Sequence, residues 1–83
     1  MIYIDISAPF WGDLLNKDTT MNALWNIMVS INDCKTYAKG IKPQDFVLED
    51  LQFYFGIKGN ASQMAEQLEF IYIILNQKAN EKS

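Results

Sequence analysis

Residues 20–40, TMNALWNIMVSINDCKTYAKG, carry an apolar pattern that assigns this chain of 83 residues to a helical fold. Large apolar side chains recur at intervals of three and four residues, the spacing of one face of an α-helix: Met21, Leu24, Trp25, Met28 and Ile31. Ile27 and Val29 widen this stripe, so we expect a central helix that ends near Gly40, a residue type common after helix ends. Trp25 lies at the centre of the stripe and is predicted to be a core residue.

Counting a short N-terminal helix described below as the first and the central helix as the second, a third helix is predicted to open at Pro43 and to close at Gly56. Its apolar positions share one face: Val47, Leu48, Leu51, Tyr54 and Phe55. Leu51 lies at the centre of that face and is predicted to be core.

A fourth helix is predicted to begin at Asn60, with Gln63 three residues later, a pair that resembles a capping box. Its stripe consists of apolar residues at helical spacing: Met64, Leu68, Ile71 and Leu75. The segment Phe70–Leu75, FIYIIL, also has strong strand propensity. We favour a helix because the helical period begins upstream, and a strand that pairs with the N-terminus is the alternative.

The N-terminus predicts two short elements. Ile2, Ile4 and Ile6 alternate with other residues, which indicates a β-strand over Ile2–Ile6. Ser7 is a candidate N-cap for a short helix, with Pro9 in its first turn. The predicted fold is therefore mainly α: a single small helical domain over residues 1–83, with three main helices, a short N-terminal helical turn and an N-terminal β-strand. Residues 77–83 are expected to form a frayed polar tail.

The composition excludes several classes of function. The chain has no histidine, all seven basic residues are lysines, and its one cysteine is Cys34. Histidine-based nucleophile systems and a Cys/His zinc site are therefore excluded, and bidentate arginine contacts to phosphate or guanine are absent. Cys34 continues the apolar stripe of the central helix and is predicted to be a buried structural residue. We expect no enzyme activity, no catalytic residue, no metal, no cofactor and no small-molecule substrate.

Charge and hydropathy bear on partners and location. The net charge of −3 disfavours direct binding to nucleic acid. The start of the chain lacks the basic segment of a signal peptide, and the longest uncharged run, residues 19–32, is too short to span a bilayer. A single cysteine cannot form an internal disulfide, so we expect a cytoplasmic protein with no membrane interaction. The Ile-, Asn- and Lys-rich composition is associated with AT-rich genomes, including those of phages.

The region 47–68 resembles the helix-turn-helix of DNA-binding proteins, in which a glycine in the turn is followed by an aliphatic residue, here within residues 55–57. The resemblance implies a DNA-binding regulator whose second helix approaches the phosphates. That helix would carry Glu66 and Glu69, and Lys58 is the one cation nearby. A divergent helix-turn-helix regulator is therefore the alternative function.

Apolar surface in excess of one small core indicates a contact surface. Phe46 and Phe53 are seven residues apart and lie off the main stripe of the third helix, as Phe70 and Ile73 do on the fourth. A domain of this size cannot bury two faces of every helix. We therefore expect self-association, with a homodimer as one form of it, or binding to a partner protein. The alternative is that these residues close a very compact core.

The predicted partner-binding site centres on Phe46 and Phe53, with acidic residues around them: Asp45, Glu49 and Asp50. Both phenylalanines are expected to be exposed, with burial of both in the core as the alternative. The carboxylates are expected to attract a basic partner. The same carboxylates also suit the N-terminal end of a helix dipole. The preferred function is a small acidic protein, an inhibitor or adaptor encoded by a phage or mobile element, that binds a basic nucleic-acid-handling protein.

Overall fold

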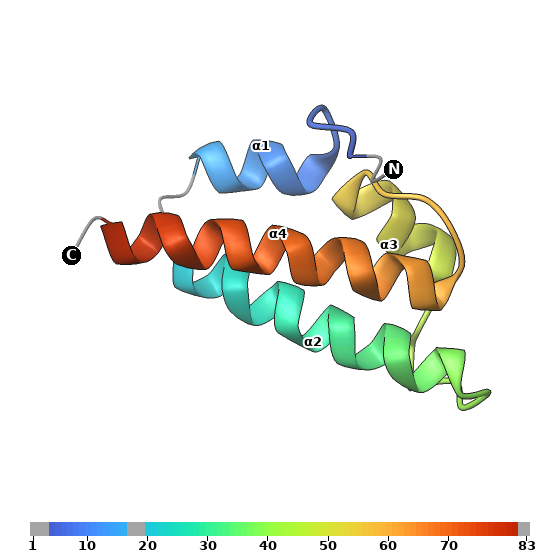
Figure 1. The fold of residues 1–83 in the computed structure, drawn as a ribbon. Helices are drawn as coiled ribbons and strands as arrows, with labels where there is room; N and C mark the ends of the chain where they lie inside the picture. Colours follow the sequence, from blue (N-terminus) through green and yellow to red (C-terminus); the bar gives the residue numbers. More distant parts are fainter. Residues whose placement is uncertain (1–3, 17–19, 82–83) are drawn as a thin grey trace.

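The computed structural model describes residues 4–16 and 20–81, and within them the chain is mainly helical. Four helices follow one another: α1 (Pro9–Asn16), α2 (Thr20–Ala38), α3 (Leu48–Phe55) and α4 (Ala61–Glu81). The long helices α2 and α4 lie side by side and run in opposite directions (Figure 1). The short helix α1 lies along another side of α4, and α3 lies near the start of α4 (Figure 1).

The core forms where these four helices converge. Its fully buried large side chains come from all four helices and from the turn after α3: Phe10, Ile27, Cys34, Phe55, Ile57, Met64, Leu68 and Ile71. Phe10 joins α1 to α3, because its ring centroid lies 4.9 Å from that of Phe55 and 5.8 Å from that of Tyr54. The expected stripe of α4 is confirmed, since its four residues are buried.

Hydrogen bonds and backbone angles at the helix ends match those predicted from the sequence. The Asn60 side chain accepts a hydrogen bond from the Gln63 backbone N–H, and the Gln63 side chain accepts one from the Asn60 N–H, both 2.9 Å long. This reciprocal pair is a capping box. Gly40 and Gly56 follow α2 and α3 with left-handed φ angles of 91° and 69°. The predicted helix ends are therefore confirmed.

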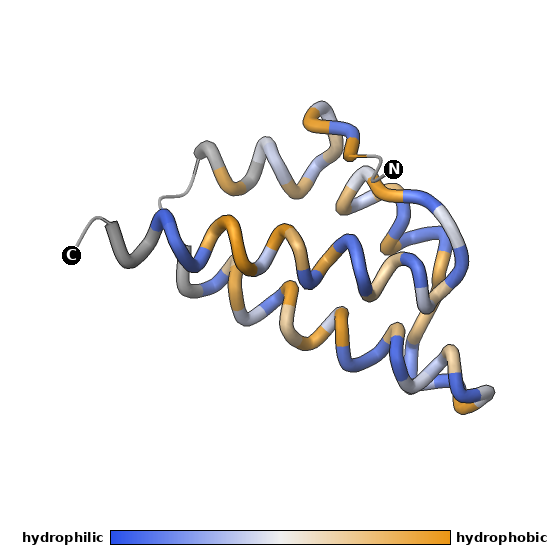
Figure 2. Tube along the Cα trace, in the orientation of Figure 1, coloured by the Kyte–Doolittle hydropathy of each residue, from blue (hydrophilic) through white to orange (hydrophobic). Residues whose placement is uncertain are grey.

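The segment Phe70–Leu75 is helical, so the favoured prediction is confirmed over the strand alternative. Its residues lie in the middle of α4, whose apolar stripe begins upstream and continues through this segment (Figure 2). The helix also includes residues 77–81 of the polar tail. Fraying of that tail stays a prediction.

The predicted N-terminal strand is wrong for the residues that the structure describes. Residues 4 and 5 have no regular secondary structure and residue 6 lies in a turn, while residues 2 and 3 of the predicted strand lie outside the described part. The Asp5 N–H donates a 2.7 Å hydrogen bond to the Gly56 carbonyl, which attaches this segment to the end of α3. Pro9 begins α1 as expected, but the expected Ser7 cap is wrong, because the Ala8 carbonyl accepts the first helical bond.

The predicted start of the third helix at Pro43 is also wrong, since α3 begins at Leu48. Asp45 has a φ of 60°, and the Phe46 N–H donates to the Pro43 carbonyl, so a turn occupies this segment. That turn directs Phe46 into the core, where its ring centroid lies 4.8 Å from that of Tyr37. A tertiary contact thus decides where the helix begins.

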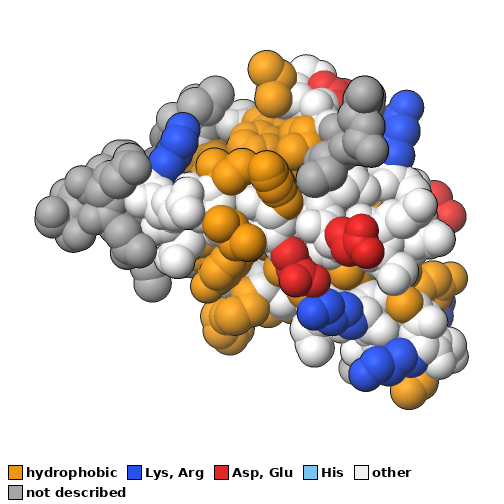
Figure 3. Space-filling view, viewed as in Figure 1, with side chains coloured by type: hydrophobic (Ala, Val, Ile, Leu, Met, Phe, Trp, Pro, Cys, Tyr) orange, Lys and Arg blue, Asp and Glu red, His pale blue; other side chains and the backbone are white. Residues whose placement is uncertain are grey.

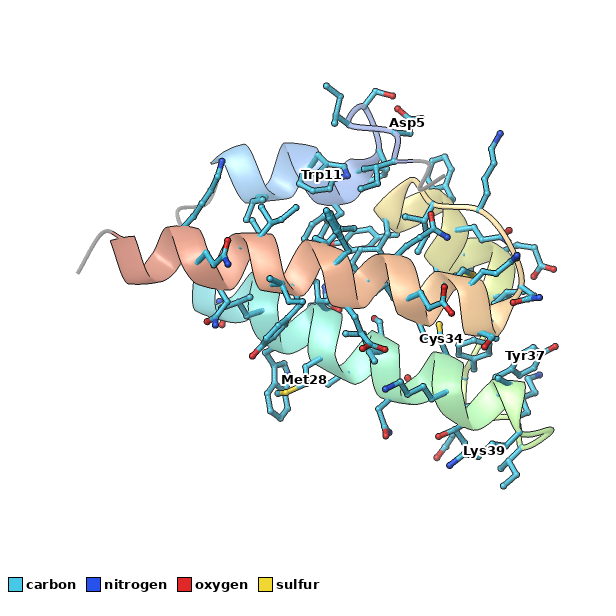
Figure 4. All side chains as sticks on the ribbon, in the orientation of Figure 1. Asp5, Trp11, Met28, Cys34, Tyr37 and Lys39 are labelled. Atoms are coloured by element: carbon cyan, nitrogen blue, oxygen red, sulfur yellow. The ribbon has the colours of Figure 1, made fainter. Side chains whose placement is uncertain are left out.

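Trp25 is 65% exposed, so its predicted core position is wrong. The face of α2 that packs inward carries Ala23, Leu24, Ile27 and Cys34 instead, and Cys34 is buried as predicted. Figure 4 shows the Cys34 sulfur between α2 and α4, and Met28 on the exposed side of α2. Leu51 is half-buried and packs against the core.

Candidate protein-binding surface

The outward face of α3 brings together three of the residues predicted for the partner-binding site. Glu49 and Asp50 lie in the first turn of α3, and Phe53 follows them by four and three residues. Side chains at these spacings are neighbours on a helix surface. Phe53 is 73% exposed, and both carboxylates are exposed. The structure therefore places an exposed aromatic ring directly beside two negative charges.

Phe53 also forms part of the rim of a groove between α3 and the N-terminal turn. The groove has a volume of about 320 Å³ and is lined by two short segments and α3: Asp5, Ser7, Ala8, Pro9, Gln52, Phe53, Gly56, Ile57 and Lys58. A volume at the lower end of the range for ligand pockets suits one inserted side chain better than a cofactor. We call this surface, with Glu49 and Asp50, the Phe53 groove.

The N-terminal wall of the groove is held by hydrogen bonds. Asp5 Oδ1 accepts bonds from the Ser7 hydroxyl (2.6 Å) and the Ser7 backbone N–H (3.0 Å). These two bonds, the hydroxyl first, lower the pKa of Asp5 against a small opposing effect of desolvation, and Lys58 lowers it further. Asp5 therefore adds a negative charge to the groove at neutral pH (Figure 4).

The opposite wall is fixed by glutamine side chains. Gln52 Nε2 donates to the Gly59 carbonyl (2.9 Å), and Gln67 Nε2 donates to the Lys58 carbonyl (2.6 Å). Both bonds attach the turn after α3 to a helix. A rigid wall lowers the entropic cost of binding, because the surface is already in its bound shape.

The remaining two residues of the predicted site lie elsewhere. Phe46 is 5% exposed and packs in the core, so the expectation that it is an exposed contact residue is wrong. Asp45 is exposed in the turn before α3, outside the outward face of that helix. Glu49 and Asp50 occupy the position that also stabilises the dipole of α3.

The sequence does not predict the N-terminal wall of the groove, because the alternation of Ile2, Ile4 and Ile6 indicates a strand there. One local signal was available: Asp5, with Ser7 two residues later, is typical of an Asx turn, which ends extended pairing. Nothing in the sequence placed this turn beside Gly56.

A second exposed apolar surface spans the two long helices. Its six members are all at least 40% exposed: Trp25, Met28 and Val29 on α2, with Phe70, Ile73 and Ile74 on α4. We call it the α2–α4 face. In Figure 3 hydrophobic side chains form a band from the N-terminal turn and α1 across α4 to α2, with acidic and lysine side chains beside its lower part.

In the part of the chain that the structure describes, no set of three or more Cys, Asp or Glu residues could hold a metal ion. Cys34 is buried, and desolvation, assisted by Asp33, raises the pKa of its thiol to about 11. The thiol therefore stays protonated and unreactive at neutral pH.

The region that resembles a helix-turn-helix consists of α3, a turn over residues 56–60 and α4. The exposed side chains in the first half of α4 include Glu66 and Glu69. Glu69 forms a 3.2 Å ion pair with Lys35 of α2. A DNA phosphate placed against this part of α4 would meet carboxylates before it met cations, which is unfavourable.

Among residues 4–16 and 20–81, no helix is both long enough and apolar enough to cross a membrane. No protein family model, no curated protein and no solved structure matches this chain.

Proposed function

We propose that this chain is a non-enzymatic protein that acts by binding another protein, as an inhibitor or adaptor, through the Phe53 groove. The observation that carries the proposal is Phe53 itself, which is 73% exposed on the rim of a preformed groove. A large exposed ring beside a pocket supplies apolar contact area at low entropic cost, as in the hot spots of protein interfaces.

The charges around the groove support a basic partner. Glu49 and Asp50 are neighbours of Phe53 on α3, and Asp5 lines the groove, where Lys58 is the one cation among the lining residues. Carboxylates at the edge of an interface accelerate encounter with a cationic surface. The proposed partner therefore inserts an apolar side chain into the groove and has lysine or arginine next to it. A basic nucleic-acid-handling protein is one class with such a surface, and a phage or mobile-element inhibitor acting in the cytoplasm would fit this proposal.

A random peptide library displayed on phage and selected against the immobilised full chain tests this proposal. We expect enriched peptides to combine a large apolar residue with nearby Lys or Arg. Phe53→Ser should abolish their binding, because it removes the ring at the rim. Ile41→Ser is the matched control, since Ile41 is 61% exposed but lies outside the groove.

The association and dissociation rates of a selected peptide separate the contribution of the acidic charges from that of the Phe53 ring. The double variant Glu49→Gln and Asp50→Asn should slow association, because it removes the attracting charges, and it should leave the dissociation rate nearly unchanged. Peptides without basic residues, or peptides that bind the Phe53→Ser variant as well as the wild type, would contradict the proposal.

A further inference from the structure

We propose that the α2–α4 face is the interface of a symmetric dimer and that a second copy of this chain covers it. This inference is independent of the proposed function, because the Phe53 groove lies on α3 and the N-terminal turn. Three observations carry it: the position of Met28 and Ile73 beside an ion pair, the exposed area of the six apolar residues, and the charges beside them.

The ion pair between Lys35 Nζ and Glu69 Oε1 fixes the position of the face. Met28 lies two turns before Lys35 on α2, and Ile73 lies one turn after Glu69 on α4. Because the two helices are antiparallel, both steps lead in the same direction from the ion pair (Figure 1). Met28 and Ile73 therefore lie on the side of the helix pair that carries the ion pair. The neighbouring residue Tyr72 is half-buried against the core, so α4 turns from the core to the exposed face between Tyr72 and Ile73.

The area of the face fits half of a protein interface. Six large side chains that are at least 40% exposed amount to apolar surface on the order of 500 Å², within the range of the largest patch on a typical monomer. A standard interface buries about 800 Å² per partner, of which the centre is apolar and the rim polar. The face supplies the apolar centre of such an interface, and its charged border supplies the polar rim.

The charges beside the face are complementary to each other across a two-fold axis. Lysines lie on the α2 side of the border (Lys35, Lys39), and glutamates lie on the α4 side (Glu66, Glu69). A two-fold axis parallel to the helices places α2 of one copy against α4 of the other, antiparallel and at the same level. Each lysine then faces a glutamate of the second copy, and Met28 lies within about one helical turn of Ile73 of the other α4.

This arrangement is a four-helix bundle in which neighbouring helices are antiparallel. The net charge of −3 on each copy opposes association only weakly, because charges beyond about 8 Å are screened at physiological salt. A border of negative charges alone would favour a strongly basic partner. This border carries both lysines and glutamates, so it favours a partner that also carries both.

Sedimentation equilibrium of the full chain from micromolar to hundreds of micromolar tests the dimer. We expect the mass of a dimer at tens of micromolar, and at least a tenfold weaker association for Ile73→Glu, which places a charge at the centre of the face. Ile41→Glu is the matched control: it introduces the same charge at an equally exposed isoleucine away from the face and should leave the mass dimeric. Circular dichroism checks that both variants fold, and Trp25→Ser repeats the test on α2.

A mixing experiment tests the orientation of the two copies. Lys39→Glu alone and Glu66→Lys alone should each weaken the homodimer, because like charges then meet twice. An equimolar mixture of the two variants should form heterodimers in preference to either homodimer, because opposite charges meet again. A monomeric mass at all concentrations, or equal dimerisation of the Ile73→Glu and Ile41→Glu variants, would overturn the proposal. Peptide binding at the Phe53 groove should persist in the Ile73→Glu variant, which separates this inference from the proposed function.

Discussion

Gly56 shows how a single residue holds the candidate site together. It ends α3 with a φ of 69°, its carbonyl accepts the hydrogen bond from Asp5, and it lies in the wall of the Phe53 groove. A Cβ atom at this position would collide with the Asp5 carbonyl oxygen and the Ala8 side chain. Glycine is therefore needed here both for the backbone angle and for the space.

Gly40 is a control for Gly56. It also has a left-handed φ, of 91°, but a Cβ atom added there would have no neighbouring atom within 4 Å. We expect Gly40→Ala to cost about 1 kcal/mol, the strain of a left-handed backbone. Gly56→Ala should cost about 3 kcal/mol, because overpacking adds to the same strain. Urea denaturation of both variants measures the difference. Equal losses of stability would show that the contact between the N-terminal turn and α3 does not constrain Gly56.

At the level of elements, α2 has two apolar stripes, and only one of them faces the core. The buried side includes Leu24, Ile27 and Cys34, whereas Trp25 and Met28 belong to the exposed α2–α4 face. Both sets have helical spacing, so periodicity alone does not separate them. The packing of α4 against α2 determines which of the two stripes is buried.

This choice gives a prediction about stability. Ile27→Ala should lower the free energy of unfolding by about 2–5 kcal/mol, because it opens a cavity in the core. Trp25→Ala should change it by less than about 0.5 kcal/mol, since the side chain is exposed. The measurement is made at a protein concentration low enough to keep the chain monomeric, because dimer formation would itself add stability. A large loss for Trp25→Ala under these conditions would mean that α2 is rotated about its axis.

At the level of the whole molecule, the distribution of charge argues against the helix-turn-helix alternative. The chain carries a net charge of −3 and no arginine, and Glu66 and Glu69 are exposed in the first half of α4. We expect no binding of a labelled DNA duplex at physiological salt in a fluorescence anisotropy titration. Sub-micromolar binding that weakens steeply with added salt would instead support a DNA-binding regulator.

The molecule also has two exposed apolar surfaces on different elements, and their charges differ. The Phe53 groove has an acidic surround, and the α2–α4 face has a border of both signs. The first suits a basic partner and the second suits a second copy. A dimer formed through the α2–α4 face would present two Phe53 grooves, so a partner with two sites would bind it more tightly than a monomer.

The sequence by itself determined the features that depend on residues close together in the chain. The capping box of Asn60 and Gln63, the helix ends at Gly40 and Gly56, and the helical state of Phe70–Leu75 were all predicted correctly. Each depends on hydrogen bonds or side-chain spacing within one or two helical turns. The exposure of Phe53 was predicted for the same reason, because it lies off the apolar stripe of its own helix.

The tertiary structure alone decided which apolar side chains are covered and which segments meet. Phe46 is buried because the turn at Asp45 directs it onto Tyr37, and Trp25 is exposed because α4 packs on another face of α2. Residues 4–6 meet the end of α3 through one hydrogen bond to Gly56 rather than through a strand partner. Burial is a property of the neighbouring element, and a periodic pattern shows that a helix has an apolar face without showing which neighbour will cover it.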